Sequence, residues 1–333
     1  MNSRFSFDLA PDCSIFTRDH KAKTSDFSQV DAIVEFKKES KDPFVDDSNS
    51  EGNPEMKNNP FLCKEGPNRD VLGQLTAYAT ATLGAQYRTH LFMVLIAGEY
   101  ARLIRWDRGG AIVTGRIPFN KEPYFFDFLT RYDMASREDR GHDTTVSVPS
   151  EDEIKNATRV VKEWAEAEAF LAITISHRPF IIPHPEVRPH IPVGRWTRSS
   201  IAFDVDKQRR VYLKDFWRVL MDDIEPEGQI YDRLHTNNVP NIPPCLLSGD
   251  VSDDTHHKSR THEVSHKYFP NHSCWKRITI YRHYRIVLGA VGIPLEKFTH
   301  TRGFVRAMYA ALKGKITIFL AVCLRNLTLH YSS

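Results

Sequence analysis

The stretch Val211-Tyr-Leu-Lys-Asp-Phe-Trp-Arg218 is rich in β-branched and aromatic residues, a composition typical of a β-strand. Strand alternation places Tyr212 and Lys214 on the same face. The segment Glu227-Gly-Gln-Ile-Tyr-Asp-Arg-Leu234 follows, with Glu227 thirteen residues after Lys214, and its apolar residues recur at helical spacing. A strand-borne lysine and a helix-borne glutamate could therefore face each other. The alternative interpretation is a surface lysine and a solvated glutamate, which the spacing alone leaves open.

Further stretches on both sides match a known family. They are Pro192-Val-Gly-Arg-Trp-Thr-Arg-Ser-Ser-Ile-Ala-Phe-Asp204, Val239-Pro-Asn-Ile242, Arg282-His-Tyr-Arg-Ile-Val-Leu288 and Gly292-Ile-Pro-Leu295, with Arg69-Asp-Val-Leu-Gly-Gln-Leu75, Tyr100-Ala-Arg-Leu-Ile-Arg-Trp-Asp107 and Arg140-Gly-His-Asp143 upstream. Through them the chain resembles the fungal-type protein kinase family from about residue 10 to residue 313.

The resemblance implies ATP and Mg²⁺ as cofactors and phosphotransfer to Ser/Thr substrates at the level of the family. Lys214 and Glu227 would form the ion pair that anchors the nucleotide phosphates. Gly194 would stand in the place of the glycine-rich loop, although the sequence has no Gly-x-Gly-x-x-Gly. Residues Arg285–Gly292 would form the edge strand and the hinge over the adenine.

Two motifs of protein kinases are missing from the 333 residues, His-Arg-Asp and Asp-Phe-Gly. They carry the aspartate that accepts the substrate proton and the aspartate that holds Mg²⁺. Residues 314–333 also differ from the continuation that the family would have. We therefore expect a truncated, catalytically incomplete chain without a complete C-lobe, or alternatively a pseudokinase-type interaction protein.

A second candidate site lies in the first third of the chain, where Pro11-Asp12, Glu35-Phe-Lys37 and Gln74-x-x-x-Tyr78 occur in this order. Alternation puts Glu35 and Lys37 on the same face of one strand, and Gln74 and Tyr78 lie one turn apart on an uncharged helix. Two carboxylates can bind Mg²⁺, and a nearby lysine can orient or deprotonate a water molecule.

This order of residues resembles the metal-dependent nucleases of restriction-endonuclease-like fold. The resemblance implies Asp12 and Glu35 as metal ligands, and Asp12, Glu35, Lys37 and Gln74 as candidate catalytic residues. Nucleic acid would be a partner only if this region were an active nuclease. The other expected partners are a nucleotide and a protein substrate or binding partner.

The fold expected from these signals is α+β or α/β with two domains. Residues 1–135 form a mixed-sheet, restriction-endonuclease-like α/β domain, and residues 191–313 a kinase-like N-lobe with a five-stranded antiparallel sheet, one helix and a hinge. Between them, residues 136–190 form a helical segment (Glu151–Leu171) and a linker, because five prolines between His177 and Pro192 argue against helices and central strands. Residues 314–333 form an atypical tail.

The other predicted elements follow from local periodicity and turn signals. The strands are Phe5–Thr17, Val30–Lys37, Leu91–Ile96, Tyr100–Trp106, Ala111–Ile117, a hairpin of Ile201–Asp206 with Arg210–Lys214, and a strand pair around Ile278–Leu288. The helices are Val71–Tyr87, a short one within Lys121–Arg140, Pro226–His235 and Phe304–Leu312. The polar segment Lys38–Asn59 is predicted to be a loop.

His262-Glu-Val-Ser-His266 matches the zinc-protease pattern His-Glu-x-x-His, which requires a regular helix. Its flanks are polar and are broken by Pro270, so we expect it to lie in a solvated loop over Ser248–His272. Adventitious metal binding by the histidines of this loop stays open; these are His256, His257, His262 and His266.

Composition further limits the possible partners and the cellular compartment of the protein. A net charge of +3 is too small to indicate nucleic-acid binding by itself, and the five cysteines show no Cys-x-x-Cys spacing. A reducing compartment, the cytoplasm or the nucleus, is therefore expected. The N-terminus lacks the apolar core of a signal peptide, and the longest apolar run, Ile316–Leu324, is too short for a transmembrane helix.

Overall fold

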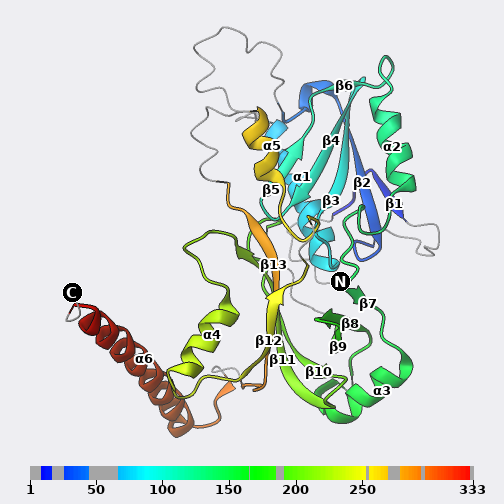
Figure 1. Cartoon of the computed structure of the whole chain (residues 1–333). Coiled ribbons are helices and arrows are strands. Elements are labelled where there is room, and N and C mark those ends of the chain that lie inside the picture. The colour runs from blue at the N-terminus through cyan, green and yellow to red at the C-terminus, as the bar shows by residue number, and fades with distance from the viewer. Residues whose placement is uncertain are drawn as a thin grey trace. The chain divides into compact units, whose positions relative to one another are not determined.

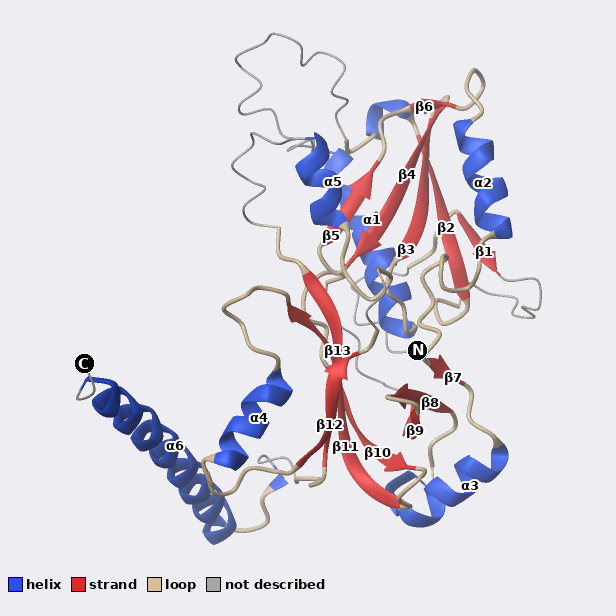
Figure 2. Ribbon diagram, in the orientation of Figure 1, coloured by secondary structure: helices blue, strands red, loops and turns tan. Residues whose placement is uncertain are grey.

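The computed structural model describes residues 9–16, 26–44, 67–164, 166–184, 191–252, 255–268, 278–293 and 297–330. Within these ranges the chain forms two β-sheets and six α-helices (Figure 1 and Figure 2). It divides into two compact units, the first made of residues 1–144, 186–196 and 252–282, the second of residues 145–185, 197–251 and 283–333. A fold with one mixed and one antiparallel sheet, as expected from the sequence, is confirmed.

The first unit is built on a six-stranded mixed sheet. Its strands are β1 (Cys13–Phe16), β2 (Val30–Lys37), β3 (Leu91–Ala97), β4 (Tyr100–Asp107) and β5 (Gly110–Val113), adjacent in that order, with β6 (Ile117–Pro118) paired to β4. β2 and β3 are parallel, and the other pairs are antiparallel. A parallel pair needs a crossover, and helix α1 (Pro67–Ala85) supplies it while contacting both strands.

Two predictions for this unit need correction. The strand expected over Phe5–Thr17 is described only from Cys13 to Phe16, and Phe5 lies outside the described residues. The strand expected over Ala111–Ile117 is wrong, because β5 ends at Val113 and β6 starts at Ile117. Here the Thr114 hydroxyl accepts the N–H of Leu103 at 3.0 Å, so a side chain interrupts the ladder.

Two shorter helices belong to the same unit. Helix α2 (Tyr124–Met134) lies within the range predicted for it and packs Phe128 and Tyr132 against Phe92 of β3. The loop expected over Lys38–Asn59 contains one 3₁₀ turn, η1 (Glu39–Lys41), and its residues beyond Phe44 lie outside the described ones.

The second unit contains a seven-stranded antiparallel sheet, two strands more than the five expected. Its strand order is β12-β13-β11-β10-β9-β8-β7, with β7 (Val146–Ser147), β8 (Phe170–Ile175), β9 (Arg178–Pro183), β10 (Arg198–Asp204), β11 (Arg209–Val219), β12 (Cys245–Asp250) and β13 (Tyr281–Leu288). β10 and β11 form the predicted hairpin. The strand pair expected around Ile278–Leu288 is instead one strand, β13. It lies between β12 and β11, so the expectation of an edge strand at Arg285–Gly292 is wrong.

The interpretation of His177–Pro192 as a linker is wrong for residues 178–183, because they form β9, which lies between β8 and β10 in the sheet. Pro179 and Pro183 stand next to or at the ends of this strand, where a missing amide donor costs least. Between them, Phe180 and Ile181 are fully buried. Burial of this apolar centre outweighs the proline signal.

The helix expected over Glu151–Leu171 is also too long. Helix α3 (Glu151–Val160) starts with a capping box on Ser150, and a 3₁₀ turn, η3 (Lys162–Trp164), follows it. Phe170 then begins β8, and its ring lies 5.7 Å from that of Trp164 in the same buried cluster. Trp164 and Phe170, which fall near the helical spacing in the sequence, therefore lie in a 3₁₀ turn and a strand, and both pack in the buried cluster.

Three helices follow the hairpin. Helix α4 (Glu227–Thr236) matches its prediction within one residue and contacts β12. Helix α5 (Thr261–Tyr268) occupies sequence predicted to be a loop, so that prediction is wrong. Helix α6 (Thr301–His330) extends the helix predicted over Phe304–Leu312 and runs through residue 313 without a break. None of the helices described here is long and apolar enough to cross a membrane.

Candidate functional site

Lys214 and Glu227 meet in the second unit. The Lys214 ammonium donates to both oxygens of the Glu227 carboxylate, with Nζ 2.9 Å from Oε1 and 2.6 Å from Oε2. The two side chains are 25% and 24% exposed, so the ion pair is partly open to solvent. The structure thus brings together the two residues that the sequence placed on a strand and on the following helix.

Local structure explains this meeting. Lys214 lies near the middle of β11, and its neighbours Leu213 and Asp215 point to the opposite, buried face of the strand. Pro226 is the N-cap of α4, and Glu227 is therefore in the first helical turn, where the helix dipole favours a carboxylate. The pair joins the centre of a sheet to the start of a helix.

Phe216 lies beside the ion pair on the same strand face. The Lys214 Nζ atom stands 4.7 Å from the centroid of the Phe216 ring, a cation–π contact. The ring itself is buried and packs against Tyr284 of β13, with 5.4 Å between the ring centroids. The lysine is thus held from two sides, by a carboxylate and by an aromatic ring.

The opposite face of β11 carries a buried charge cluster. The Asp215 carboxylate accepts from Arg285 Nε at 2.6 Å and is 2.9 Å from His283 Nε2, and all three residues are buried. Burial by itself would raise the pKa of Asp215, but charge and hydrogen bonds from His283 and Arg285 outweigh it and hold that pKa well below its usual range.

Sequence reasoning missed this cluster, although a signal was available. Strand alternation puts Asp215 on the same face as Leu213 and Trp217, and a carboxylate on a core face needs a buried cationic partner. His283 and Arg285 alternate in the same way on β13. The cluster ties β13 to the strand that carries Lys214.

Gly194 belongs to the first compact unit, whereas Lys214 and Glu227 belong to the second. Its φ angle of 96° lies in the region that favours glycine, and a Cβ atom there would meet no heavy atom within 4 Å. Its amide N–H donates to the carbonyl of Arg108 at 2.9 Å. That bond, rather than a glycine-rich motif, fixes this loop position.

Asp12, Glu35 and Lys37 also lie together, in the first unit. The Asp12 N–H donates to Glu35 Oε2 at 3.2 Å, and Asp12 Oδ2 accepts the N–H of Phe36 at 2.9 Å. The Lys37 ammonium donates to Glu35 Oε1 and lies 3.6 Å from Asp12 Oδ2. Glu35 is 1% exposed and Asp12 is 44% exposed, so the cluster reaches the surface through Asp12.

Tyr78 of α1 completes the environment of these carboxylates. Its hydroxyl donates to the carbonyl of Ala10 at 3.0 Å, which fixes the chain just before Asp12. Burial, with the charges of Glu35 and Asp12, raises the pKa of Tyr78 to about 12. Gln74 is half-buried one turn earlier on the same helix. The order strand, strand and helix thus brings Asp12, Glu35, Lys37 and Tyr78 together.

Helix α5 starts at a carboxylate from far away in the sequence. Asp107 accepts the N–H groups of Arg260 at 2.7 Å and Thr261 at 3.2 Å, and the Thr261 hydroxyl at 2.7 Å. These bonds cap the helix, which explains why His262-Glu-Val-Ser-His266 is helical. Burial lowers the pKa of His262, and the side chain of His266 lies outside the described ones.

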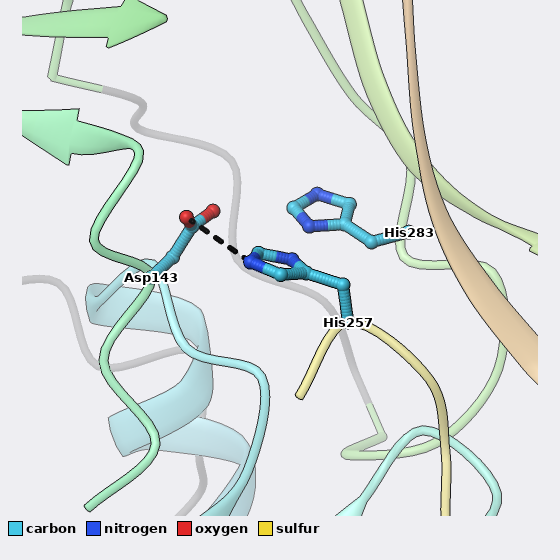
Figure 3. A group of neighbouring side chains, drawn as sticks. All are labelled: Asp143, His257 and His283. Atoms are coloured by element: carbon cyan, nitrogen blue, oxygen red, sulfur yellow. Dashed lines mark ion pairs between the residues drawn. The ribbon is translucent and has the colours of Figure 1, made fainter. Parts of the chain in front are cut away.

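Two other histidines of this segment have carboxylate neighbours within the first unit. His256 Nε2 lies 3.2 Å from Asp139 Oδ1, on the surface. His257 Nε2 lies 3.9 Å from Asp143 Oδ1, the ion pair dashed in Figure 3. Both of these side chains are buried. The sequence suggested these histidines only as adventitious metal ligands.

Comparison with known proteins adds one match. The sequence model of a family described as fungal protein kinase matches residues 55–325, which is most of the chain. Neither the search of curated proteins nor that of solved structures gave a match. The matched range includes β11 and α4, and with them the Lys214–Glu227 pair. The chain belongs to the fungal protein kinase family.

Proposed function

We propose that the second compact unit binds ATP as its magnesium complex, with Lys214 contacting the α- and β-phosphates and Glu227 orienting the lysine. One observation carries the proposal: Lys214 Nζ lies within hydrogen-bond distance of both carboxylate oxygens of Glu227. Membership of a protein kinase family supports a nucleotide as the ligand. Mg²⁺ enters only as the counter-ion of ATP, at the level of the family.

The chemistry of the pair fits a phosphate ligand. An ammonium has three N–H donors, and Glu227 occupies only one side of it. Because Lys214 is 25% exposed, its remaining donor can reach a phosphate oxygen that approaches from solvent. The carboxylate orients the amine, which is the role that phosphoryl-transfer enzymes require of such a pair.

Gly194 has a weaker place in this proposal. Its amide N–H already donates to Arg108, so we assign it no phosphate contact. Its role as the counterpart of a glycine-rich loop rests on the family resemblance alone.

A titration with Mg-ATP tests the proposal. We expect binding by the wild-type chain and at least a tenfold weaker affinity for Lys214→Met, because a charge-assisted bond to phosphate is lost. Lys207→Met is the matched control, since Lys207 is exposed in the turn between β10 and β11. Equal affinity of the Lys214→Met variant and the wild-type chain would contradict the proposal.

We further propose that these 333 residues bind nucleotide without transferring phosphate. The sequence contains no His-Arg-Asp and no Asp-Phe-Gly, and those motifs supply the catalytic aspartates of protein kinases. A phosphotransfer assay on a generic Ser/Thr substrate should give no signal above that of the Lys214→Met variant. Robust transfer that disappears in this variant would show an active kinase.

A second candidate function is metal-dependent nucleic-acid cleavage by the first unit. The supporting observation is the gathering of Asp12, Glu35 and Lys37 beside Tyr78, with Asp12 reaching the surface. Two carboxylates could hold Mg²⁺ between them, and Lys37 would then orient the attacking water. The competing view is that Lys37 neutralises the two carboxylates and that the cluster only stabilises the fold.

Mg²⁺ binding measured by calorimetry separates these two views. The nuclease proposal expects Mg²⁺ to bind and the binding to disappear in Glu35→Gln, together with any cleavage of single- or double-stranded DNA. Glu99→Gln is the control, because Glu99 is exposed in the turn between β3 and β4. If Glu35→Gln binds Mg²⁺ as the wild-type chain does, the site is not the metal centre.

A further inference from the structure

Gly228, the residue after Glu227, is the second residue of α4 and is buried where the helix packs against β12 and β13. A Cβ atom at this position would lie 2.0 Å from Ser248 Oγ, 2.6 Å from Ser248 Cβ and 2.6 Å from the Tyr284 hydroxyl oxygen. Real Cβ contacts are essentially never this short, so a side chain at residue 228 would push α4 away from the sheet. The lack of a side chain therefore permits the present position of the helix.

The sheet side of this contact cannot easily yield. Ser248 is paired with Ile286, and Tyr284 with Asp250, so both residues are fixed in the ladder between β12 and β13. Ser248 is exposed, so its hydroxyl can rotate, but its Cβ atom is attached to the paired strand, and Tyr284 is 3% exposed. Glycine is also unfavourable within a helix. Its presence in the first turn of α4 is therefore explained by the close packing against the sheet.

Tyr284 also caps the helix. The N-cap residue of α4 is Pro226, whose side chain offers no acceptor, and the structure shows no side-chain cap from it. The amide N–H of Gly228 instead donates to the Tyr284 hydroxyl at 3.1 Å. A tyrosine from β13 thus accepts a hydrogen bond that an N-cap serine or aspartate would normally accept.

The same tyrosine supports the lysine. Its ring packs on Phe216 with 5.4 Å between centroids, and the Phe216 ring lies 4.7 Å from Lys214 Nζ. Tyr284 therefore positions Glu227 through Gly228, and Lys214 through Phe216. The contacts form a closed ring that starts and ends at the ion pair.

We infer that Gly228 and Tyr284 are positioning residues that hold α4 in the ion-paired state, so that the second unit assembles the Lys214–Glu227 pair from its own residues. The inference rests on the proposed nucleotide site for its functional meaning. It predicts a site whose assembly needs no additional segment or partner to press α4 against the sheet. Regulation by outward movement of α4 would then require breaking the Gly228 contact.

The test measures the ion pair without nucleotide, by the rate at which an amine-acylating reagent modifies Lys214, followed by mass spectrometry. Gly228→Ala should raise that rate at least threefold, because α4 moves and uncovers the ammonium. Gly249→Ala is the matched control on β12, since a Cβ there meets no atom within 4 Å. Tyr284→Phe, which removes only the hydroxyl, should raise the rate by a smaller factor.

A compensating variant makes the test specific for packing. Combining Gly228→Ala with Ser248→Gly and Tyr284→Phe removes the atoms that the new Cβ would contact. The acylation rate of Lys214 should then fall back toward the rate measured for Tyr284→Phe. If Gly228→Ala does not fold, the comparison of Tyr284→Phe with the wild-type chain decides. Unchanged Lys214 acylation in Gly228→Ala, or in Tyr284→Phe where that variant decides, would overturn the inference.

Mg-ATP affinity of the same variants separates this inference from the proposed function. If Gly228→Ala raises acylation while the wild-type chain binds no ATP, the positioning role stands and the nucleotide site fails. If the wild-type chain binds ATP and Gly228→Ala changes neither affinity nor acylation, the positioning role fails and the nucleotide site stands.

Discussion

Asp215 Oδ2 lies 2.6 Å from Arg285 Nε, on the face of β11 opposite to Lys214. Two consecutive residues of one strand thus form ion pairs on the two sides of the sheet, one partly exposed and one buried. The exposed pair is the candidate ligand site, and the buried pair fixes the strand that carries it.

Asp215→Asn should destabilise the second unit strongly. Arg285 is 1% exposed, and removal of its counter-charge leaves a buried cation without compensation, which costs about 3–5 kcal/mol. Urea unfolding checks this against Asp222→Asn, a control at an exposed position after β11. A free energy of unfolding equal to that of the control would contradict the structural role of the pair.

The stability difference between the wild-type chain and Asp215→Asn should depend on pH. The folded state depresses the pKa of Asp215, so the carboxylate contributes its stability above the unfolded pKa of about 3.9 and loses it as the pH falls. The difference should shrink as the pH falls through that unfolded pKa, toward a limiting slope of about 1.4 kcal/mol per pH unit. Urea unfolding of both chains from pH 3 to pH 7 measures it. A difference that grows on acidification would have the wrong sign.

Asp107→Ala should loosen helix α5, and it also removes the ion-pair partner of Arg105, which lies 2.8 Å from Asp107. The variant removes the acceptor of the Arg260 and Thr261 amides, and the loss of such a cap costs about 0.5–2 kcal/mol. Hydrogen exchange should become faster for the amides of α5, and remain unchanged there in Asp127→Ala, where an exposed carboxylate of α2 is removed. Equal protection of α5 in both variants would rule out Asp107 as its cap.

Tyr78→Phe should release the chain segment that carries Asp12. The hydroxyl bond to Ala10 contributes about 0.5–1.5 kcal/mol, and without it the hydrogen bond from the Phe36 amide to Asp12 should break more often. Faster exchange of the Phe36 amide is the expected result. Tyr124→Phe, at a side chain that is 61% exposed, should leave this amide unaffected. No change in Tyr78→Phe would mean that Asp12 is held by other contacts.

The local sequence pattern was sufficient to predict a strand or helix where burial and periodicity agree. The alternating residues of β11 and the helical spacing after Glu227 predicted the two elements that carry Lys214 and Glu227. The same holds for β2, whose predicted limits, Val30 and Lys37, are those observed. The roles of these residues toward ATP or Mg²⁺ stay predictions.

Long-range contacts account for the failures. Helix α5 is capped by Asp107, more than 150 residues earlier in the sequence, and no local signal indicates such a partner. Strand β9 has prolines near both of its ends, and only its pairing with β8 and β10 makes it a strand. The sequence around Gly228 gives no sign of its packing role, which follows only from the positions of Ser248 and Tyr284 in the structure.

A double-mutant cycle on Lys214 and Glu227, read out by Mg-ATP affinity, tests the central claim most directly. If the glutamate acts by orienting the lysine, Glu227→Gln should weaken binding in the wild-type chain but have little further effect in Lys214→Met. The expected coupling energy is about 1–2 kcal/mol, within the range for residues in direct contact. Additive effects of the two substitutions, or no ATP binding by the wild-type chain, would contradict the account.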